Sequence, residues 1–235
     1  MTRALDEWGW DERWDTVLHE TGTDRGQPAR VTSQHRGRWT LQTVDGPRGA
    51  RVAGSQSGAH MAATGDWVVA EPGPYPTDPW SILDVLSRRS AIERGSAGDR
   101  RSQQVLAANV DRLWIVHGLD TEPNQRRLER YLAVGWESCA APEVVLTKSD
   151  LADQLEESVS AARDVALGVP VWVVSMSDSK AVGALRDSLE MGSTVALVGP
   201  SGSGKSTLIN LLAEAEVAER KVRERAEAKK AKKEA

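Results

Sequence analysis

Apolar and polar residues follow two different patterns along the chain. Short alternating runs begin at about residue 37 and are separated by turn signals, and this pattern predicts strands. We expect these strands over residues 38–43, 65–70 and 81–86, with a turn at 44–46. The first third of the chain is therefore predicted to contain a small β-rich module.

A second pattern begins at residue 112, where apolar runs alternate with amphipathic segments. Alternation of this kind predicts an α/β fold with a parallel sheet covered by helices. The expected order is strand 112–118, helix 124–137, strand 143–147, helix 151–167, strand 171–175, helix 180–190, strand 194–198 and helix 205–215. Residues 94–102 are rich in glycine and polar side chains and are expected to link the two regions.

The segment GPSGSGKS at 199–206 is a complete phosphate-binding loop. Its glycines let backbone amides surround a phosphate, Lys205 adds a positive charge, and the Ser206 hydroxyl is suited to Mg²⁺. The predicted strand before it and helix after it place the phosphate at a helix N-terminus, where free amides favour an anion. The alternative is a glycine-rich turn without function, which would leave this combination of features unexplained.

The segment TKSD at 147–150 follows the predicted strand 143–147. The Asp150 carboxylate can accept two hydrogen bonds from guanine, whereas adenine would leave it unpaired. The aliphatic stem of Lys148 is expected to lie along the base. The alternative is a solvated turn in which Ser149 or Asp150 caps the next helix.

The base-reading element precedes the phosphate loop, the reverse of the order in ordinary small GTPases, so the chain resembles a circularly permuted GTPase. Residues from about 37 to 212 are similar to the ribosome small-subunit-dependent GTPase A family. The segments that carry this similarity are 86–94, 104–116 and 128–132. The resemblance implies an OB-type β-barrel before a permuted P-loop GTPase domain, with a zinc module and a basic helix following it. It also implies work on the small ribosomal subunit and its rRNA.

By this resemblance, Ser175 and Met176 stand in a second guanine-contacting element. Ser206 is the expected Mg²⁺ ligand, and no water-positioning catalytic residue is assigned. The residues expected to hold GTP or GDP are Thr147, Lys148, Ser149, Asp150, Ser175, Met176, Gly199, Pro200, Ser201, Gly202, Ser203, Gly204, Lys205, Ser206 and Thr207.

The chain departs from the family at several places. Met176 and Ser177 depart from the usual Ser-Ala-Lys or Ser-Ala-Leu pattern of the second guanine-contacting element. Thr147 stands where the family usually has Asn, which predicts weaker bracing of the phosphate loop. No switch threonine and no DxxG follow Ser206, so the GTPase domain is expected to be incomplete. The family binds zinc, but Cys139 is the only cysteine, so no zinc site is expected in this chain.

Composition limits the partners. The formal net charge of −4 argues against a general nucleic-acid coat, so any RNA contact must be local. Candidate contacts are the Lys- and Arg-rich tail, the pairs Arg88–Arg89 and Arg100–Arg101, and barrel tryptophans. Trp39, Trp67 and Trp80 are expected either to stack on bases or to fill the barrel core. No membrane segment and no signal peptide are recognised, which predicts a cytoplasmic protein. A monomer is expected.

The sequence thus predicts four parts. They are an N-terminal arm at 1–36, an OB-like barrel at 37–94, an incomplete permuted GTPase domain at 95–215, and a basic helical tail at 216–235. Trp8, Trp10 and Trp14 in the arm are expected to pack onto the barrel, with a short amphipathic helix as the alternative. Two other functions stay open, an ATP-binding cassette-type ATPase fragment and a module that binds guanine nucleotide or RNA without turnover.

Overall fold

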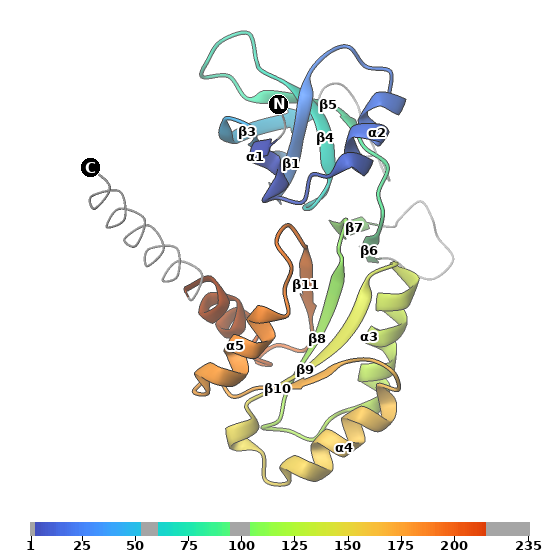
Figure 1. Cartoon of the computed structure of the whole chain (residues 1–235), viewed down its shortest axis with the longest axis vertical. Coiled ribbons are helices and arrows are strands. Elements are labelled where there is room, and N and C mark those ends of the chain that lie inside the picture. Colours follow the sequence, from blue (N-terminus) through green and yellow to red (C-terminus); the bar gives the residue numbers. More distant parts are fainter. Residues whose placement is uncertain (1–2, 53–60, 95–103, 215–235) are drawn as a thin grey trace, which may run out of the picture. The chain divides into compact units, whose positions relative to one another are not determined.

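The structure is a computed structural model that describes residues 3–52, 61–94 and 104–214 (Figure 1). The predicted basic tail, most of the predicted linker and the pair Arg100–Arg101 lie outside these residues. The described chain forms two compact units, each assembled from separate segments. The first contains Met1–Leu113, Ala133–Pro142 and Glu190–Ala196, and the second contains Trp114–Leu132, Glu143–Leu189 and the chain from Leu197 onward.

A closed five-stranded barrel lies in the first unit, which confirms the OB-type module. Its strand order is β1-β2-β3-β5-β4. The strands are β1 (Gln27–His35), β2 (Arg38–Thr43), β3 (Gly46–Val52), β4 (Trp67–Glu71) and β5 (Trp80–Val85). Strand β1 falls within the stretch expected to be the arm. Arg36 and Gly37, both at positive φ, form the tight turn between β1 and β2, and this geometry suits the twist of a hairpin.

The barrel tryptophans are all buried, but in two different cores. Trp39 and Trp80, 6% and 7% exposed, lie in the barrel core, whereas Trp67, 0% exposed, belongs to a second cluster with Trp10 and Trp14. The prediction that they stack on bases is therefore wrong, and the alternative of a barrel-core role is confirmed for Trp39 and Trp80 only.

Residues before the barrel form two short helices, α1 (Arg3–Asp6) and α2 (Glu12–Glu20). The Asp11 side chain caps α2 by accepting from the backbone amides of Arg13 and Trp14. Trp10 and Trp14 pack on Trp67, with ring centroids 4.8 Å and 6.0 Å from it. The short helix considered as an alternative is thus present. Trp10 and Trp14 pack onto the barrel as expected, whereas Trp8 is 41% exposed.

Arg88 and Arg89, which were expected to contact RNA, form ion pairs within the first unit. Arg88 donates from Nε and Nη2 to the fully buried Asp66 carboxylate, both at 2.7 Å. Arg89 lies over the Trp14 ring and within 4 Å of carboxylates of Asp11 and Asp111. The prediction that this pair is an RNA contact is therefore not supported, because both guanidinium groups already have anionic partners.

Arg30 is a further buried arginine of this unit. It donates to the Trp8 carbonyl and to Thr194 Oγ1, both at 2.8 Å, and its guanidinium lies over Trp67. Burial lowers the pKa of Arg30 to about 10, so it is still charged at neutral pH. This cation links the arm, the barrel and the segment before β11.

The α/β region contains a four-stranded sheet in the order β10-β9-β8-β11. Its strands are β8 (Arg112–Gly118), β9 (Ala141–Thr147), β10 (Val171–Val173) and β11 (Val195–Val198). Its helices are α3 (Gln125–Glu137), η2 (Ser149–Leu151), α4 (Leu155–Val165) and α5 (Ser179–Asp187), and residues 205–214 are helical as well. Strand β10 pairs with β9 in parallel. The α/β class is therefore confirmed, with helix ends that differ from prediction by a few residues.

The sequence did not predict the hairpin between the two patterns. Strand β6 (Ala91–Arg94) pairs antiparallel with β7 (Gln104–Ala108) in a two-stranded sheet. The run 104–108 has only weak alternation, so its pairing depends on a partner strand rather than on its own pattern.

Candidate nucleotide-binding site

The phosphate-binding loop connects β11 to the helix that begins at Lys205. Gly199 has φ +149°, and a Cβ there would clash with the Val116 carbonyl, so only glycine fits. Lys205 Nζ donates to the carbonyls of Gly199 at 3.0 Å and Pro200 at 2.6 Å. The ammonium is thereby held within the loop, where it could also donate a hydrogen bond to a bound phosphate.

Thr147 joins the base-reading element to this loop. It is fully buried, and its hydroxyl lies 2.7 Å from the Ser203 carbonyl and 3.3 Å from the His117 carbonyl. A threonine hydroxyl has one proton, and the shorter distance assigns it to Ser203. The residue expected to weaken the bracing of the loop therefore makes a direct hydrogen bond to it.

Met176 approaches the same loop from the end of β10. A Cβ added to Gly204, at φ +89°, would lie 3.3 Å from both Met176 Cε and Thr147 Oγ1. The elements at 147–150 and 175–176 thus both contact the loop, and all three lie in the second compact unit.

Asp150 is exposed, and its side chain has one partner among the described residues. Ser175 Oγ donates to Asp150 Oδ1 at 2.6 Å, while Ser175 itself is buried and 2.7 Å from Ser177 Oγ. The alternative in which Ser149 or Asp150 caps a helix is not supported, since η2 and α4 have no side-chain cap. A carboxylate has about four acceptor positions, so Asp150 retains capacity for a ligand's N–H groups.

Lys148 adopts a left-handed backbone conformation, with φ +56°. Its Nζ lies 2.6 Å from Asp120 Oδ2 in the loop after β8. Its stem passes over Gly118, where a Cβ would approach Lys148 Cδ to 3.2 Å and Cε to 3.4 Å. Lys148 is thus fixed at both its backbone and its ammonium.

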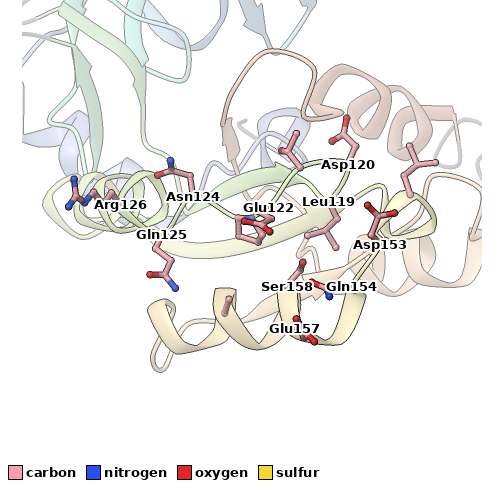
Figure 2. A pocket seen from close by; sticks show the side chains of 14 residues that line it. Leu119, Asp120, Glu122, Asn124, Gln125, Arg126, Asp153, Gln154, Glu157 and Ser158 are labelled. Atoms are coloured by element: carbon pink, nitrogen blue, oxygen red, sulfur yellow. The ribbon is translucent and has the colours of Figure 1, made fainter.

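An open hollow of about 950 Å³ lies between the loop after β8 and the start of α4 (Figure 2). Its carboxylates are Asp120, Glu122, Asp153 and Glu157, and it contains no residue of the phosphate-binding loop. Negative charge disfavours phosphate, so this hollow is poorly suited to the phosphates of a nucleotide.

Ser206, the expected Mg²⁺ ligand, is exposed in the first turn of the helix after the loop. Within residues 3–52, 61–94 and 104–214, no group of three or more His, Cys, Asp or Glu side chains is placed to hold a metal. None of the described helices is long and apolar enough to cross a membrane.

The sequence did not predict Asp120, which lies in no motif and contacts Lys148 from 28 positions away. Ser177 stands in the second guanine-contacting element and lies 2.7 Å from Ser175 Oγ. The position of Asp120 just after β8 could have pointed to it, since ligand-binding residues gather at the carboxyl ends of strands in open α/β sheets.

Comparisons with known proteins agree with this geometry. A family model described as RsgA GTPase matches residues 85–231. The small ribosomal subunit biogenesis GTPase RsgA of Opitutus terrae is 37% identical over 221 residues, 89% of this chain and 60% of the relative. The protein of that name from Xanthomonas axonopodis pv. citri is 38% identical over 219 residues, 87% of this chain and 57% of the relative. This chain therefore spans somewhat over half the length of these relatives.

Two solved structures share the fold. YjeQ from Thermotoga maritima has a TM-score of 0.62 at 22% identity, with 79% of this chain and 64% of that chain covered. YloQ, described as a circularly permuted GTPase, has a TM-score of 0.57 at 18% identity, with 80% and 64% covered. These matches confirm the permuted GTPase fold and do not favour the ATP-binding cassette alternative.

Proposed function

We propose, for a chain that belongs to the RsgA GTPase family, that it binds GTP and GDP with Mg²⁺, hydrolyses GTP and acts on the small ribosomal subunit. We also propose a cytoplasmic location, a monomeric state and the order arm, barrel, permuted GTPase domain and basic tail, with the barrel beginning at β1 (Gln27–His35) instead of residue 37. The relatives of this name are longer than the chain, so their activity is proposed here for the part that this chain represents.

The observation that carries the proposal is the hydrogen bond from Thr147 to the Ser203 carbonyl. It joins the base-reading element directly to the phosphate-binding loop, as one nucleotide bound to both would require. In the proposed complex, Asp150 accepts from guanine, the Met176 amide donates to the base, and Lys205 with the loop amides binds the phosphates. Ser206 would ligand Mg²⁺, which supplies charge neutralisation for the phosphates when bound.

The proposed specificity for guanine comes from hydrogen bonds to the Asp150 carboxylate. An exposed carboxylate held by Ser175 is poised as an acceptor for two N–H groups, and adenine presents no such pair. We expect the chain to bind GDP in Mg²⁺ buffer at least tenfold more tightly than ADP, as roughly one charged hydrogen bond would provide. Titration of fluorescent GDP and ADP tests this, and tighter binding of ADP would exclude the guanine assignment.

Turnover is tested separately. Phosphate release from GTP should rise when small ribosomal subunits are added, and Lys205→Ala should abolish it. Nucleotide binding without any release, with or without subunits, would instead establish the non-catalytic module.

The barrel presents a row of basic side chains that suits RNA. Trp39 pairs with Ala50 across β2 and β3, so the next position of this antiparallel register places Arg38 opposite Arg51. Arg38 also pairs with His35 across β2 and β1. All three side chains are exposed. In the described part of the chain, no carboxylate is recorded within 4 Å of either arginine, whereas Arg25 of the same barrel pairs with Glu71. Like charges directly opposite in a sheet are unfavourable unless an anion lies over them.

We expect Arg38→Gln/Arg51→Gln to weaken binding of small-subunit rRNA fragments and to reduce the salt dependence of log K by roughly 1.4, for two lost phosphate contacts on a single strand. Arg25→Gln removes one charge from the same barrel at an arginine that already has a partner, and serves as the control. An unchanged salt slope in the double variant would remove this row from the RNA contact.

A further inference from the structure

Asp120 is a charged group that no motif predicts, beside the expected guanine-reading lysine. Its Oδ2 lies 2.6 Å from Lys148 Nζ, and the two side chains are 41% and 26% exposed. The hydrogen bond from Lys148 is the main cause that lowers the pKa of Asp120, so the carboxylate is ionised throughout the physiological range. The pair is therefore charged and in direct contact before any nucleotide binds.

The backbone around the pair fixes it in place. The Leu119 amide donates to the Thr147 carbonyl at 2.8 Å, which ties the loop after β8 to the residue before Lys148. The His117 ring contacts the Thr121 carbonyl at 3.2 Å and holds the far side of this loop. Asp120 is thus presented by a loop that is itself anchored to the base-reading element.

Gly118 provides the space for the lysine stem. A Cβ there would lie 2.6 Å from Asp120 Oδ1 and 3.2 Å from Lys148 Cδ. Any larger residue would push the stem away from the end of β8. The stem can therefore lie against the strand end only because residue 118 has no side chain.

From these contacts we infer that Asp120 is a positioning residue for guanine binding, which fixes the Lys148 stem as a preformed wall for the base. A mobile lysine side chain loses conformational entropy when a ligand orders it, and this loss weakens binding. A protein partner that already holds the side chain in place avoids this entropy loss at the binding step. The inference rests on the proposed function, since it concerns the base of the same nucleotide. Its effect is confined to the base, because Asp120 touches no residue of the phosphate-binding loop in the described chain.

The experiment compares Asp120→Ala with Glu122→Gln, a control that removes an exposed charge from the same loop. We expect Asp120→Ala to weaken GDP binding by about three- to tenfold, the range for ordering one long side chain. Binding of pyrophosphate, which occupies the phosphate loop alone, should be unchanged, and Glu122→Gln should bind both ligands as the parent does. A variant whose site is generally misfolded would instead bind both GDP and pyrophosphate more weakly.

A double-mutant cycle with Lys148→Ala completes the test. In the Lys148→Ala background, Asp120→Ala should have no further effect on GDP, since the two residues act through one contact. Equal GDP affinity in the parent and in Asp120→Ala, or an equal loss in both backgrounds, would overturn the inference while leaving guanine binding intact. A parent chain that binds pyrophosphate but not GDP would overturn the proposed function, and the inference with it.

Discussion

The hydroxyl of Thr147 offers the most direct test of how the two halves of the nucleotide site are joined. Thr147→Val keeps the shape of the side chain and removes the donor to the Ser203 carbonyl, in a position that is 0% exposed. A buried acceptor left without a partner costs about 1–3 kcal/mol. If that cost falls on the loop that binds GDP, GDP affinity decreases by roughly 5- to 150-fold.

The control is chosen to match burial and geometry. The Thr43 hydroxyl is also fully buried and donates to the Gly46 carbonyl at 2.8 Å, but in the barrel. Thr43→Val should lower the free energy of unfolding by a similar amount without a comparable effect on GDP. Thr147→Ser keeps the donor and should bind GDP within a few-fold of the parent.

Calorimetric titration with GDP and urea unfolding measure the two quantities on each variant. Equal GDP affinity in Thr147→Val and Thr43→Val would show that the Thr147 bond contributes only to stability. A loss of affinity in Thr147→Ser as large as in Thr147→Val would show that the hydroxyl donor is not what matters for GDP.

Three further predictions follow from charged contacts. Asp150→Asn should reduce the preference for GDP over ADP by at least about tenfold in a competition assay, and an unchanged preference would argue against its role in reading the base. Arg88→Met should lower the free energy of unfolding by about 3–5 kcal/mol in urea, because it leaves the buried Asp66 carboxylate unpaired, and a neutral result would contradict that pairing. The lowered pKa of Asp120 means that its contact with Lys148 stabilises the fold above about pH 4 and is lost as the pH falls through the folded-state pKa. Carbon-detected NMR should give an Asp120 titration midpoint below about 3.9, and Lys148→Met should raise it, whereas equal midpoints would exclude the contact in solution.

Local motifs were the most predictable part of this molecule. The loop around Lys205 and the turn at Thr147 each depend on a few adjacent residues, so their types and spacing suffice to place them. The α/β alternation is equally local, and it was assigned with small errors at helix ends, where capping and tertiary contacts decide the boundary.

Contacts between distant segments were less predictable. The start of the barrel was missed because β1 contains Pro28 and the buried Arg30, which hide its strand pattern. Arg88 was expected at a surface because its partner, Asp66, lies far along the chain and belongs to no motif. Asp120 was missed for the same reason, since only the folded loop brings it to Lys148.

The three indoles of Trp10, Trp14 and Trp67 also give the chain an intrinsic optical probe. Their centroids lie 4.8–6.4 Å apart, close enough for their electronic transitions to couple. The circular dichroism of these rings should therefore report directly on whether the N-terminal helices are docked on the barrel. Docking of the leading segment can then be followed without a label, in the same sample in which ligand binding is measured.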